Sequence, residues 1–402
     1  MDIEKQTKRI YVDNSAATPV DERVLLAMEP YWRDVMGNPG SIHREGQIAK
    51  SAVEKARATV AGIIHARKEQ VVFTSGGTES NSLAIQGIIR TVLSCGRPAS
   101  KTHVLVSEIE HDSVLKHCAS LIREGLRVDM LQVDCSGHVL THELRDAISE
   151  DTVLVSLVHV NNEIGTIQDV EDIGKVIRHA RKKNGSIYPL LHYDACQSPT
   201  WTPLHVERMS ADTMTLDSQK CYGPKGVGCL FVRDSTLVTP IVSVASQEYG
   251  LRPGTPPVPL IVGFTEALSL VEEERDKYVS TVEGLRKCLI DTVLENVPNA
   301  LHNGTNGDRA AAGIISLSFE GVESEQLVIE LDARGIAASA GSACVSDFSN
   351  GSHVIRAVQK GRDTKRYGTV RFSLSRYTTE EEITFVSKAL IETVHRLREN
   401  AS

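Results

Sequence analysis

Short apolar runs alternate with longer amphipathic stretches along the first 260 residues of this 402-residue chain. The segment VVFTSGG at 71–77 has the pattern of a strand that runs into a glycine turn, and the stretch at 78–93 has the pattern of a helix. The runs at 153–160, 188–195 and 228–234 are almost continuously apolar, which is typical of strands buried on both faces. This alternation predicts an α/β domain with a mainly parallel sheet.

The pattern changes near residue 260. A stretch at 260–298 that is rich in Glu, Arg and Leu predicts one or two long helices. Shorter segments with strand and helix patterns follow, up to a final amphipathic helix at 379–398. Such a mixture suits a smaller α+β domain. We therefore expect residues 15–262 to form a large domain, and residues 1–14 together with 263–402 to form a small one.

Composition and charge argue against several classes of protein. The net charge of −8 is the opposite of the basic footprint of nucleic-acid binding, and no window of 18 apolar residues predicts a membrane span. The eight cysteines include no CxxC pair, so no metal site is expected. The first residues lack an apolar signal core, and we expect a cytoplasmic protein with reduced thiols. The cysteines expected to be buried and structural are Cys95, Cys118, Cys229 and Cys288.

Several candidate binding residues lie at predicted carboxyl ends of strands, where open α/β sheets bind ligands. His111 could stack on a planar ring and move a proton, and Asp194 could pair with a protonated pyridine nitrogen. The amides of NNEIG at 161–165 could donate hydrogen bonds to a ring oxygen or a carboxylate. Each feature alone has a structural alternative, which is a turn, a helix cap or a hydrogen-bonded core residue.

Two further segments complete the pattern. TSGGTES at 74–80 combines a strand end, a glycine turn and a helix start, whose N–H groups and Thr78 hydroxyl would hold a phosphate; a structural glycine turn is the alternative. Lys220 precedes a tight Tyr-Gly-Pro-Lys-Gly loop that could desolvate its amine; a turn with solvated lysines is the alternative. Together, a stacking aromatic, a ring acid, amide donors, a phosphate turn and a lysine are the parts that a pyridoxal phosphate site needs.

These residues lie in segments that resemble the cysteine desulfurases of the nitrogen-fixation and iron–sulfur-cluster type, within the class V aminotransferase family. The matching segments follow the family's order from residue 11 to about 385; they are YVDNSAATP, GNPGSIHREG, VVFTSGGTESNSLAI, EIEHDSVL, VHVNNEIGTIQDV, YDACQS, QKCYGPKGVG, LRPGTPPVP, SAGSACVSD and VRFSLSRYTTEEEI. The resemblance implies an aspartate-aminotransferase-like fold (fold type I), with a mainly parallel seven-stranded sheet in the large domain. It also implies a homodimer whose active sites lie at the subunit interface.

The resemblance further implies a role for each candidate residue. Lys220 would be linked covalently to pyridoxal 5′-phosphate. Cys344, in a small and polar segment typical of a loop, would attack the sulfur of L-cysteine and leave L-alanine and a Cys344 persulfide; a buried structural cysteine is the alternative. Arg371 would clamp the substrate carboxylate. The remaining residues implied to contact the cofactor or substrate are His111, which would also take part in catalysis, Asp194, Gln197, Asn162, Gly77, Thr78, Ser218, Gln219 and, from the other subunit, Thr255.

Two segments depart from the family pattern. Where this chain has Asp217 and Gln219, the family has a serine and a histidine that help to hold the phosphate. An ionised Asp217 facing the phosphate would repel it by roughly 1–4 kcal/mol; otherwise Asp217 points away and Ser218 takes over. At 244–246 the chain has Val-Ala-Ser in place of glycines, so we expect a different path for that loop.

Three functions fit these motifs. The preferred one is a cysteine desulfurase that passes sulfur to an acceptor protein, such as an iron–sulfur scaffold, or to tRNA thiolation. The second is a selenocysteine lyase, because Gln247 and the LRPGT that follows it resemble that branch as well. The third is a weakly catalytic protein that binds sulfur-transfer partners. Only the changes at Asp217, Gln219 and 244–246 favour it.

Overall fold

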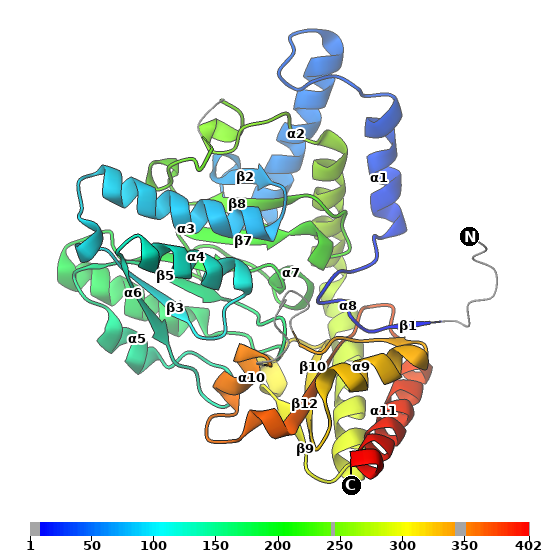
Figure 1. The fold of residues 1–402 in the computed structure, drawn as a ribbon. Coiled ribbons are helices and arrows are strands. Elements are labelled where there is room, and N and C mark those ends of the chain that lie inside the picture. Colours follow the sequence, from blue (N-terminus) through cyan, green and yellow to red (C-terminus); the bar gives the residue numbers. More distant parts are fainter. Residues whose placement is uncertain (1–8, 243–245, 342–350, 402) are drawn as a thin grey trace.

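The structure is a computed structural model and describes residues 9–242, 246–341 and 351–401. Its centre is a sheet of seven strands in the order β2-β8-β7-β6-β5-β3-β4 (Figure 1). The strands are β2 (Val71–Thr74), β3 (His103–Ser107), β4 (Arg127–Leu131), β5 (Thr152–Val158), β6 (Leu190–Asp194), β7 (Thr213–Asp217) and β8 (Gly228–Val232). Only β8 runs antiparallel to its neighbours. The predicted α/β class and the mainly parallel seven-stranded sheet are confirmed.

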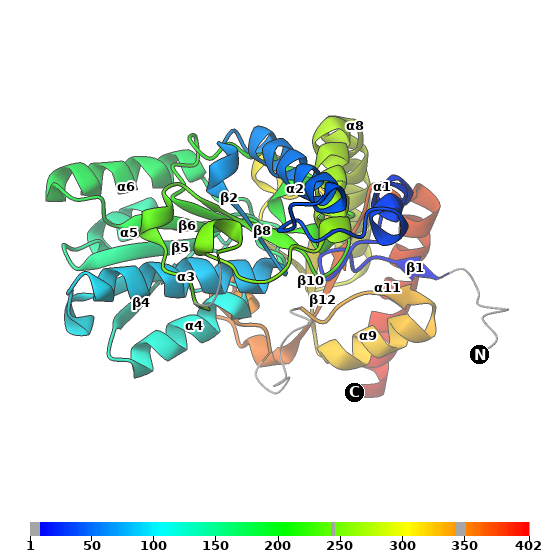
Figure 2. The same cartoon turned by 90° about the horizontal axis from the view of Figure 1, so that it is seen from above.

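Helices cover both faces of this sheet, as the view from above shows (Figure 2). Alternate residues of one strand point to opposite faces: Val104 and Val106 pack with α3 and α4, whereas Leu105 packs with the helices of the other face. Because both faces are covered, the strands are buried along their whole length, except for β4 at the edge. The covering helices are α2 (Arg44–Ile63), α3 (Gly77–Ser94), α4 (Asp112–Arg123), α5 (Thr141–Ala147), α6 (Val170–Asn184) and the first half of α8 (Val258–Asn296).

A second apolar cluster gathers around a smaller antiparallel sheet of order β12-β10-β9. Its parts are β9 (Ala300–Asn303), β10 (Ile314–Glu320), β12 (Tyr367–Ser373), α9 (Ser324–Ala333), α11 (Glu380–Ala401) and the second half of α8, with β1 (Ile10–Tyr11) paired to β11 (Ile336–Ala337) nearby. The remaining helices are α1 (Glu22–Arg33), α7 (Ser198–Trp201) and α10 (His353–Val358). The helix α8 runs beside both sheets (Figure 1). The division expected after residue 262 falls inside it, and the domain boundaries stay a prediction.

Some local expectations were wrong. The strand β3 ends at Ser107, so His111 does not end a strand but caps the amino terminus of α4. Cys118 and Cys229 are buried as expected, whereas Cys95, at the end of α3, and Cys288, on the outer side of α8, are exposed. Within the described ranges, no helix is both long and apolar enough to cross a membrane.

Candidate active site

The sheet brings several predicted site residues to one edge. Asp194 is the last residue of β6 and Asp217 the last residue of β7, and these two strands are parallel neighbours. Lys220 follows Asp217 at the end of the short 3-10 helix η3 (Ser218–Lys220). Cys196 lies within the electrostatic reach of all three side chains. Burial and the two carboxylates raise the pKa of its thiol well above the ordinary value, so Cys196 stays protonated and is a poor nucleophile.

The amine of Lys220 is held by main-chain carbonyls from the beginning of the chain. Its Nζ donates to Ser15 O at 2.8 Å and to Ala16 O at 2.6 Å. Gln197 Nε2 donates to the same Ser15 carbonyl at 2.9 Å. The segment after β1 therefore fixes the direction of the lysine and of the predicted ring-binding amide together. Sequence reasoning missed Ser15 and Ala16 because main-chain carbonyls leave no trace in side-chain identity.

A hydrogen-bond network joins the predicted ring acid to the predicted stacking residue. Asn81, on α3, donates from Nδ2 to Asp194 Oδ2 at 2.8 Å and to Ser113 Oγ at 2.9 Å. Ser113 Oγ lies 2.8 Å from His111 Nδ1, which also accepts the Ser113 backbone N–H at 3.1 Å. Because Nδ1 accepts that bond, a neutral His111 carries its proton on Nε2. Asn81 and Ser113 were not predicted; they hold Asp194 and His111 in a fixed relation.

The orientation of Asn81 is fixed from its other side. His192 Nε2 lies 3.2 Å from Asn81 Oδ1, and His192 Nδ1 lies 2.9 Å from Thr213 Oγ1. Burial lowers the pKa of His192 to about 4. A neutral His192 that donates from Nε2 leaves the Asn81 oxygen as the acceptor and turns the Asn81 NH₂ group toward Asp194.

Glu110 is a fully buried carboxyl group next to His111. Its Oε1 accepts hydrogen bonds from Ser107 Oγ and from Val158 N at 2.7 Å, and its Oε2 has no partner among the described residues. Burial raises the pKa of Glu110 to about 8, against the hydrogen bonds from Ser107 and Val158 that lower it. The side chain therefore remains protonated in the folded protein at neutral pH.

This shift predicts a pH-dependent stability. The folded state keeps the Glu110 proton between about pH 4.5 and 8 while the unfolded chain loses it, so stability falls as pH rises across that window. Glu110→Gln should remove this slope, and the wild type should lose about 1–4 kcal/mol more than the variant between pH 5 and 8. Urea unfolding at several pH values measures the difference. The control is Glu295→Gln, which changes an exposed glutamate. Equal slopes of unfolding free energy against pH in the wild type and in Glu110→Gln would contradict a buried, protonated Glu110.

Arg371 is almost completely buried and already has a carboxylate partner. Its Nη2 lies 2.6 Å from Asp13 Oδ1, and its Nη1 donates to Asn162 O at 3.2 Å. Its Nε has no partner among the described residues. The structure thus brings Asn162 and Arg371 together, as the predicted substrate-binding pair requires, with a free donor on the guanidinium.

Two of the residues predicted to bind the phosphate, Gly77 and Gln219, are hydrogen-bonded to Asp217 instead. Gly77 N, at the start of α3, donates to Asp217 Oδ2 at 3.1 Å, and Gln219 Nε2 donates to the same oxygen at 3.2 Å. Thr78 is exposed. Ser218 Oγ is buried without a described partner, on the side of the loop where Gly223 lies. The residues therefore fit the ring and the lysine-linked end of pyridoxal phosphate but not its phosphate, because a carboxylate already takes those donors.

Other predicted residues lie apart from this cluster or cannot be placed. Thr255 is exposed in the loop before α8, and no described contact joins it to Lys220 or Asp194 in the same chain. Cys344 lies outside the described residues, as do Val244 and Ala245. Just after them, Glu248 turns inward and forms a buried ion pair with Arg57 at 2.7 Å.

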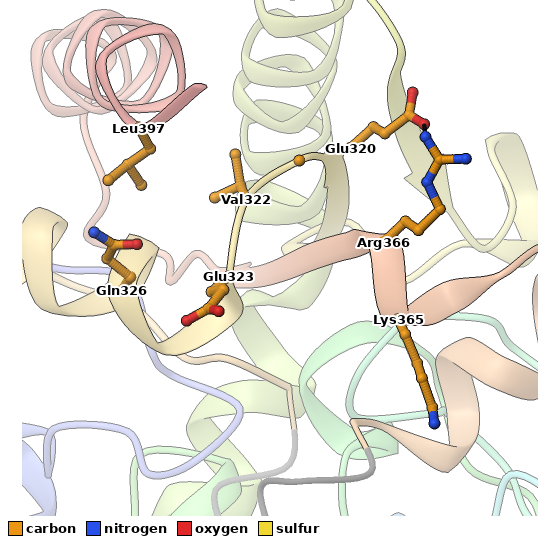
Figure 3. A pocket seen from close by; sticks show the side chains of 8 residues that line it. Glu320, Val322, Glu323, Gln326, Lys365, Arg366 and Leu397 are labelled. Carbon is orange, nitrogen blue, oxygen red and sulfur yellow. Dashed lines mark ion pairs between the residues drawn. The ribbon is translucent and has the colours of Figure 1, made fainter. Parts of the chain in front are cut away.

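A separate pocket of about 360 Å³ lies beside the smaller sheet, between the end of β10, the start of α9 and the residues before β12. Figure 3 shows Glu320 paired with Arg366, and Lys365 directed away from that pair. The residues that line this pocket include none of the predicted site residues, so it is not part of the candidate active site.

Comparison with known proteins identifies the family to which this chain belongs. The family model described as aminotransferase class-V matches residues 10–386. The mitosomal cysteine desulfurase of Trachipleistophora hominis is 41% identical over 97% of this chain and 87% of its own length. A solved structure described as a NifS-like protein aligns with a TM-score of 0.87 and 33% identity over 97% of this chain and all of its own. Another, described as SspA in complex with cysteine, has a TM-score of 0.77 and 33% identity over 92% of this chain and all of its own. The chain therefore belongs to the class V aminotransferase family and, within it, to the cysteine desulfurases.

Proposed function

We propose that this protein converts L-cysteine to L-alanine and transfers the sulfur to Cys344. The observation that carries the proposal is the pairing of two features at one sheet edge. One is the Lys220 amine held by two carbonyls, and the other is the buried Asp194 carboxylate tied through Asn81 to His111. A lysine near a buried acid and an imidazole is the residue set that a pyridoxal cofactor requires. The neighbour described as SspA in complex with cysteine supports cysteine as the substrate.

The cofactor of this site is proposed to be pyridoxal 5′-phosphate, which supplies an electron sink when bound. Lys220 would hold it, and Asp194, fixed by Asn81, would accept a hydrogen bond from the protonated ring nitrogen. His111, with Nδ1 engaged by Ser113, would offer the Nε2 proton to the bound substrate. Gln197 and Asn162 would direct polar atoms toward the ring oxygen and the substrate.

Cys344 is the residue proposed to react with the substrate sulfur. Its thiolate would attack the substrate sulfur, so that the carbon–sulfur bond of cysteine breaks and a sulfur–sulfur bond forms. The former sulfur-bearing carbon takes up a proton and becomes the methyl group of alanine. Cys344 is left as a persulfide, and an acceptor thiol or an acceptor protein, such as an iron–sulfur scaffold, takes the terminal sulfur in the next step.

The direct test is an assay with the purified protein, pyridoxal phosphate and a reducing thiol. Equal amounts of alanine and sulfide from L-cysteine are expected. L-Selenocysteine is assayed in parallel, and activity on selenocysteine alone would move the assignment to a selenocysteine lyase. No product from either compound at any cofactor concentration would contradict the proposal.

Arg371 is proposed to bind the substrate carboxylate. Lysine at this position keeps the charge but loses the planar pair of donors. Arg371→Lys should therefore raise KM for cysteine about 10- to 100-fold, with a smaller change in kcat. Steady-state kinetics measures KM and kcat separately. The matched control is Arg309→Lys, because Arg309 is an exposed arginine that pairs with Asp169. A fall in kcat with unchanged KM would argue against carboxylate binding.

The protein is also proposed to act as a homodimer, with Thr255 of one subunit reaching the site of the other. Large apolar side chains are exposed on α1 and just after it, as expected of a surface covered by a second copy. These residues are Leu25, Leu26, Trp32, Met36 and Ile42. Light scattering during size-exclusion chromatography should give twice the chain mass, and a monomer at micromolar concentration would contradict the dimer.

The compartment is proposed to be the cytoplasm. Seven cysteines lie in the described ranges and none of them is in a disulfide, which suits a reducing compartment. The Trachipleistophora relative is a mitosomal protein, so an organelle is the alternative that fractionation of cells must test. Recovery of the protein with an organelle fraction would overturn the cytoplasmic assignment.

A further inference from the structure

The place where a phosphate would bind contains an anion that belongs to the chain itself. Three N–H groups donate to the Asp217 carboxylate: Gly77 N at 3.1 Å, Gln219 N at 3.2 Å and Gln219 Nε2 at 3.2 Å. Gly77 is the first residue of the 18-residue helix α3, whose free N–H groups and dipole favour a negative charge. Asp217 thus uses the donors that a phosphate ester would need.

The position of this carboxylate is fixed by its surroundings. Asp217 ends β7 and is 6% exposed. A Cβ atom on Gly77 would lie 3.2 Å from Asp217 Oδ2 and 2.6 Å from Cys196 Sγ, so the space beside the glycine turn is filled. Turning Asp217 away to admit a phosphate would remove the three N–H donors of a buried carboxylate, which costs free energy.

No cation offsets this charge within the part of the chain that the structure describes. Asp217 has no ion pair there, and Lys220 Nζ is directed to the Ser15 and Ala16 carbonyls. A phosphate dianion bound beside Asp217 would add two negative charges next to a third. A carboxylate is only an acceptor, so it repels a phosphate but can accept a hydrogen bond from an alcohol.

We propose that the phosphate group adds no affinity for the cofactor in this protein, and that the site binds pyridoxal, whose 5′-hydroxyl donates to Asp217, at least as readily as pyridoxal phosphate. This inference rests on the proposed function, since it takes the ring to be held by Lys220 and Asp194. It makes Asp217 a residue that determines the specificity for the form of the cofactor.

The test compares two titrations of the cofactor-free, full-length protein, one with pyridoxal and one with pyridoxal phosphate. Binding is followed by calorimetry and by the absorbance of the bound ring, so no catalytic activity is needed. Pyridoxal closes to a hemiacetal in water, which weakens its apparent binding equally for every variant. The decisive quantity is therefore the ratio of the two dissociation constants, pyridoxal over pyridoxal phosphate, compared between variants.

Asp217→Asn removes the charge and keeps the shape, and Asp217→Ser installs the residue that the family pattern has. Both should raise the ratio at least ~10-fold, through tighter binding of pyridoxal phosphate. The control is Asp172→Asn, which removes an exposed acid from the first turn of α6 and should leave the ratio unchanged. The ratio is measured within each protein, so a lower melting temperature of a variant does not obscure it.

The outcomes are distinct. A ratio that stays the same in both Asp217 variants would overturn this inference and leave the proposed function standing. If neither compound binds to the wild type or to either variant, the cofactor assignment fails, and the proposed function fails with it. A wild-type ratio near or below one, once the hemiacetal is corrected for, that rises in both variants supports the inference whether or not the wild type turns over cysteine. A wild type that binds pyridoxal phosphate far more tightly than pyridoxal would overturn it.

Discussion

Lys220→Ala is expected to abolish sulfide release from cysteine and to remove the visible absorbance of the lysine-bound cofactor. Lys220 provides the one amine proposed to bond to the cofactor aldehyde, and its Nζ is held by the carbonyls of Ser15 and Ala16. Alanine keeps the helical turn of η3 but has no nucleophilic atom. The rate should fall by about 1000-fold or more. The measurements are an absorbance spectrum with saturating cofactor and a sulfide assay.

The matched control for this variant lies five residues later in the same loop. Lys225 is exposed, and Lys225→Ala should retain both the spectrum and the rate. Persistence of the bound-cofactor spectrum in Lys220→Ala, together with its loss in Lys225→Ala, would move the anchor to the second lysine. Retention of full activity in both variants would exclude both lysines of this loop as the anchor of the cofactor.

The features predicted most accurately from the sequence are the strands and helices that depend on a regular pattern of apolar residues. The nearly continuous apolar runs at 153–160 and 188–195 became β5 and β6, because helices on both faces of the sheet bury every position of these strands and favour apolar residues there. Asp194 was expected to end its strand and does so. The stretch rich in Glu and Leu after residue 260 became the single helix α8.

The strand β7 was not predicted. Its residues Thr213–Asp217 alternate threonine with single apolar residues, a pattern that gives no continuous apolar run. The strand is nevertheless fully buried, because β6 and β8 flank it and helices cover it. This omission affected the site directly. Once β7 is placed, Asp217 lies at the carboxyl edge of the sheet, opposite the first turn of α3.

The contacts that complete the site depend on packing between distant elements. Asn81 and Ser113 lie 32 residues apart, and they meet because α3 and α4 share one face of the sheet. His111 was placed at a strand end and instead caps α4. The turn before it directs the Glu110 side chain inward to Val158 N. A side-chain pattern along one chain cannot reveal such pairs without the order of the strands.

Substitution of Cys344 is the second change expected to have a large effect. The properties of the other cysteines exclude several of them as the sulfur acceptor. Among the seven described cysteines, burial raises the pKa of the Cys118 thiol to about 12 and raises the pKa of Cys196, Cys221 and Cys229 as well. Buried thiols of this kind are unreactive. Of the exposed cysteines, Cys95 follows the far end of α3, about 27 Å along the helix from Gly77.

The described residues on either side of 342–350 lie close to the substrate-binding pair. Ser339 N donates to Arg371 O at 3.1 Å, and Arg371 N donates to Ser339 O at 2.7 Å. On the other side, Ser352 Oγ donates to Glu163 Oε2 at 2.6 Å, one residue beyond Asn162. The chain therefore leaves and re-enters the described structure next to the residues proposed to bind the substrate, which favours Cys344 as the sulfur acceptor.

Cys344→Ser should accordingly reduce alanine and sulfide formation by about 1000-fold or more, because serine has no sulfur to form the persulfide. The absorbance of the bound cofactor should stay, since Lys220 and Asp194 are unchanged. Mass spectrometry after incubation with cysteine should find one added sulfur atom on wild-type Cys344 and none on the variant. Cys135→Ser, which removes an exposed thiol after β4, is the control and should keep full activity. Loss of the cofactor absorbance in Cys344→Ser would contradict the separate roles proposed for Lys220 and Cys344. It would mean that the cysteine holds the cofactor and does not merely receive the sulfur.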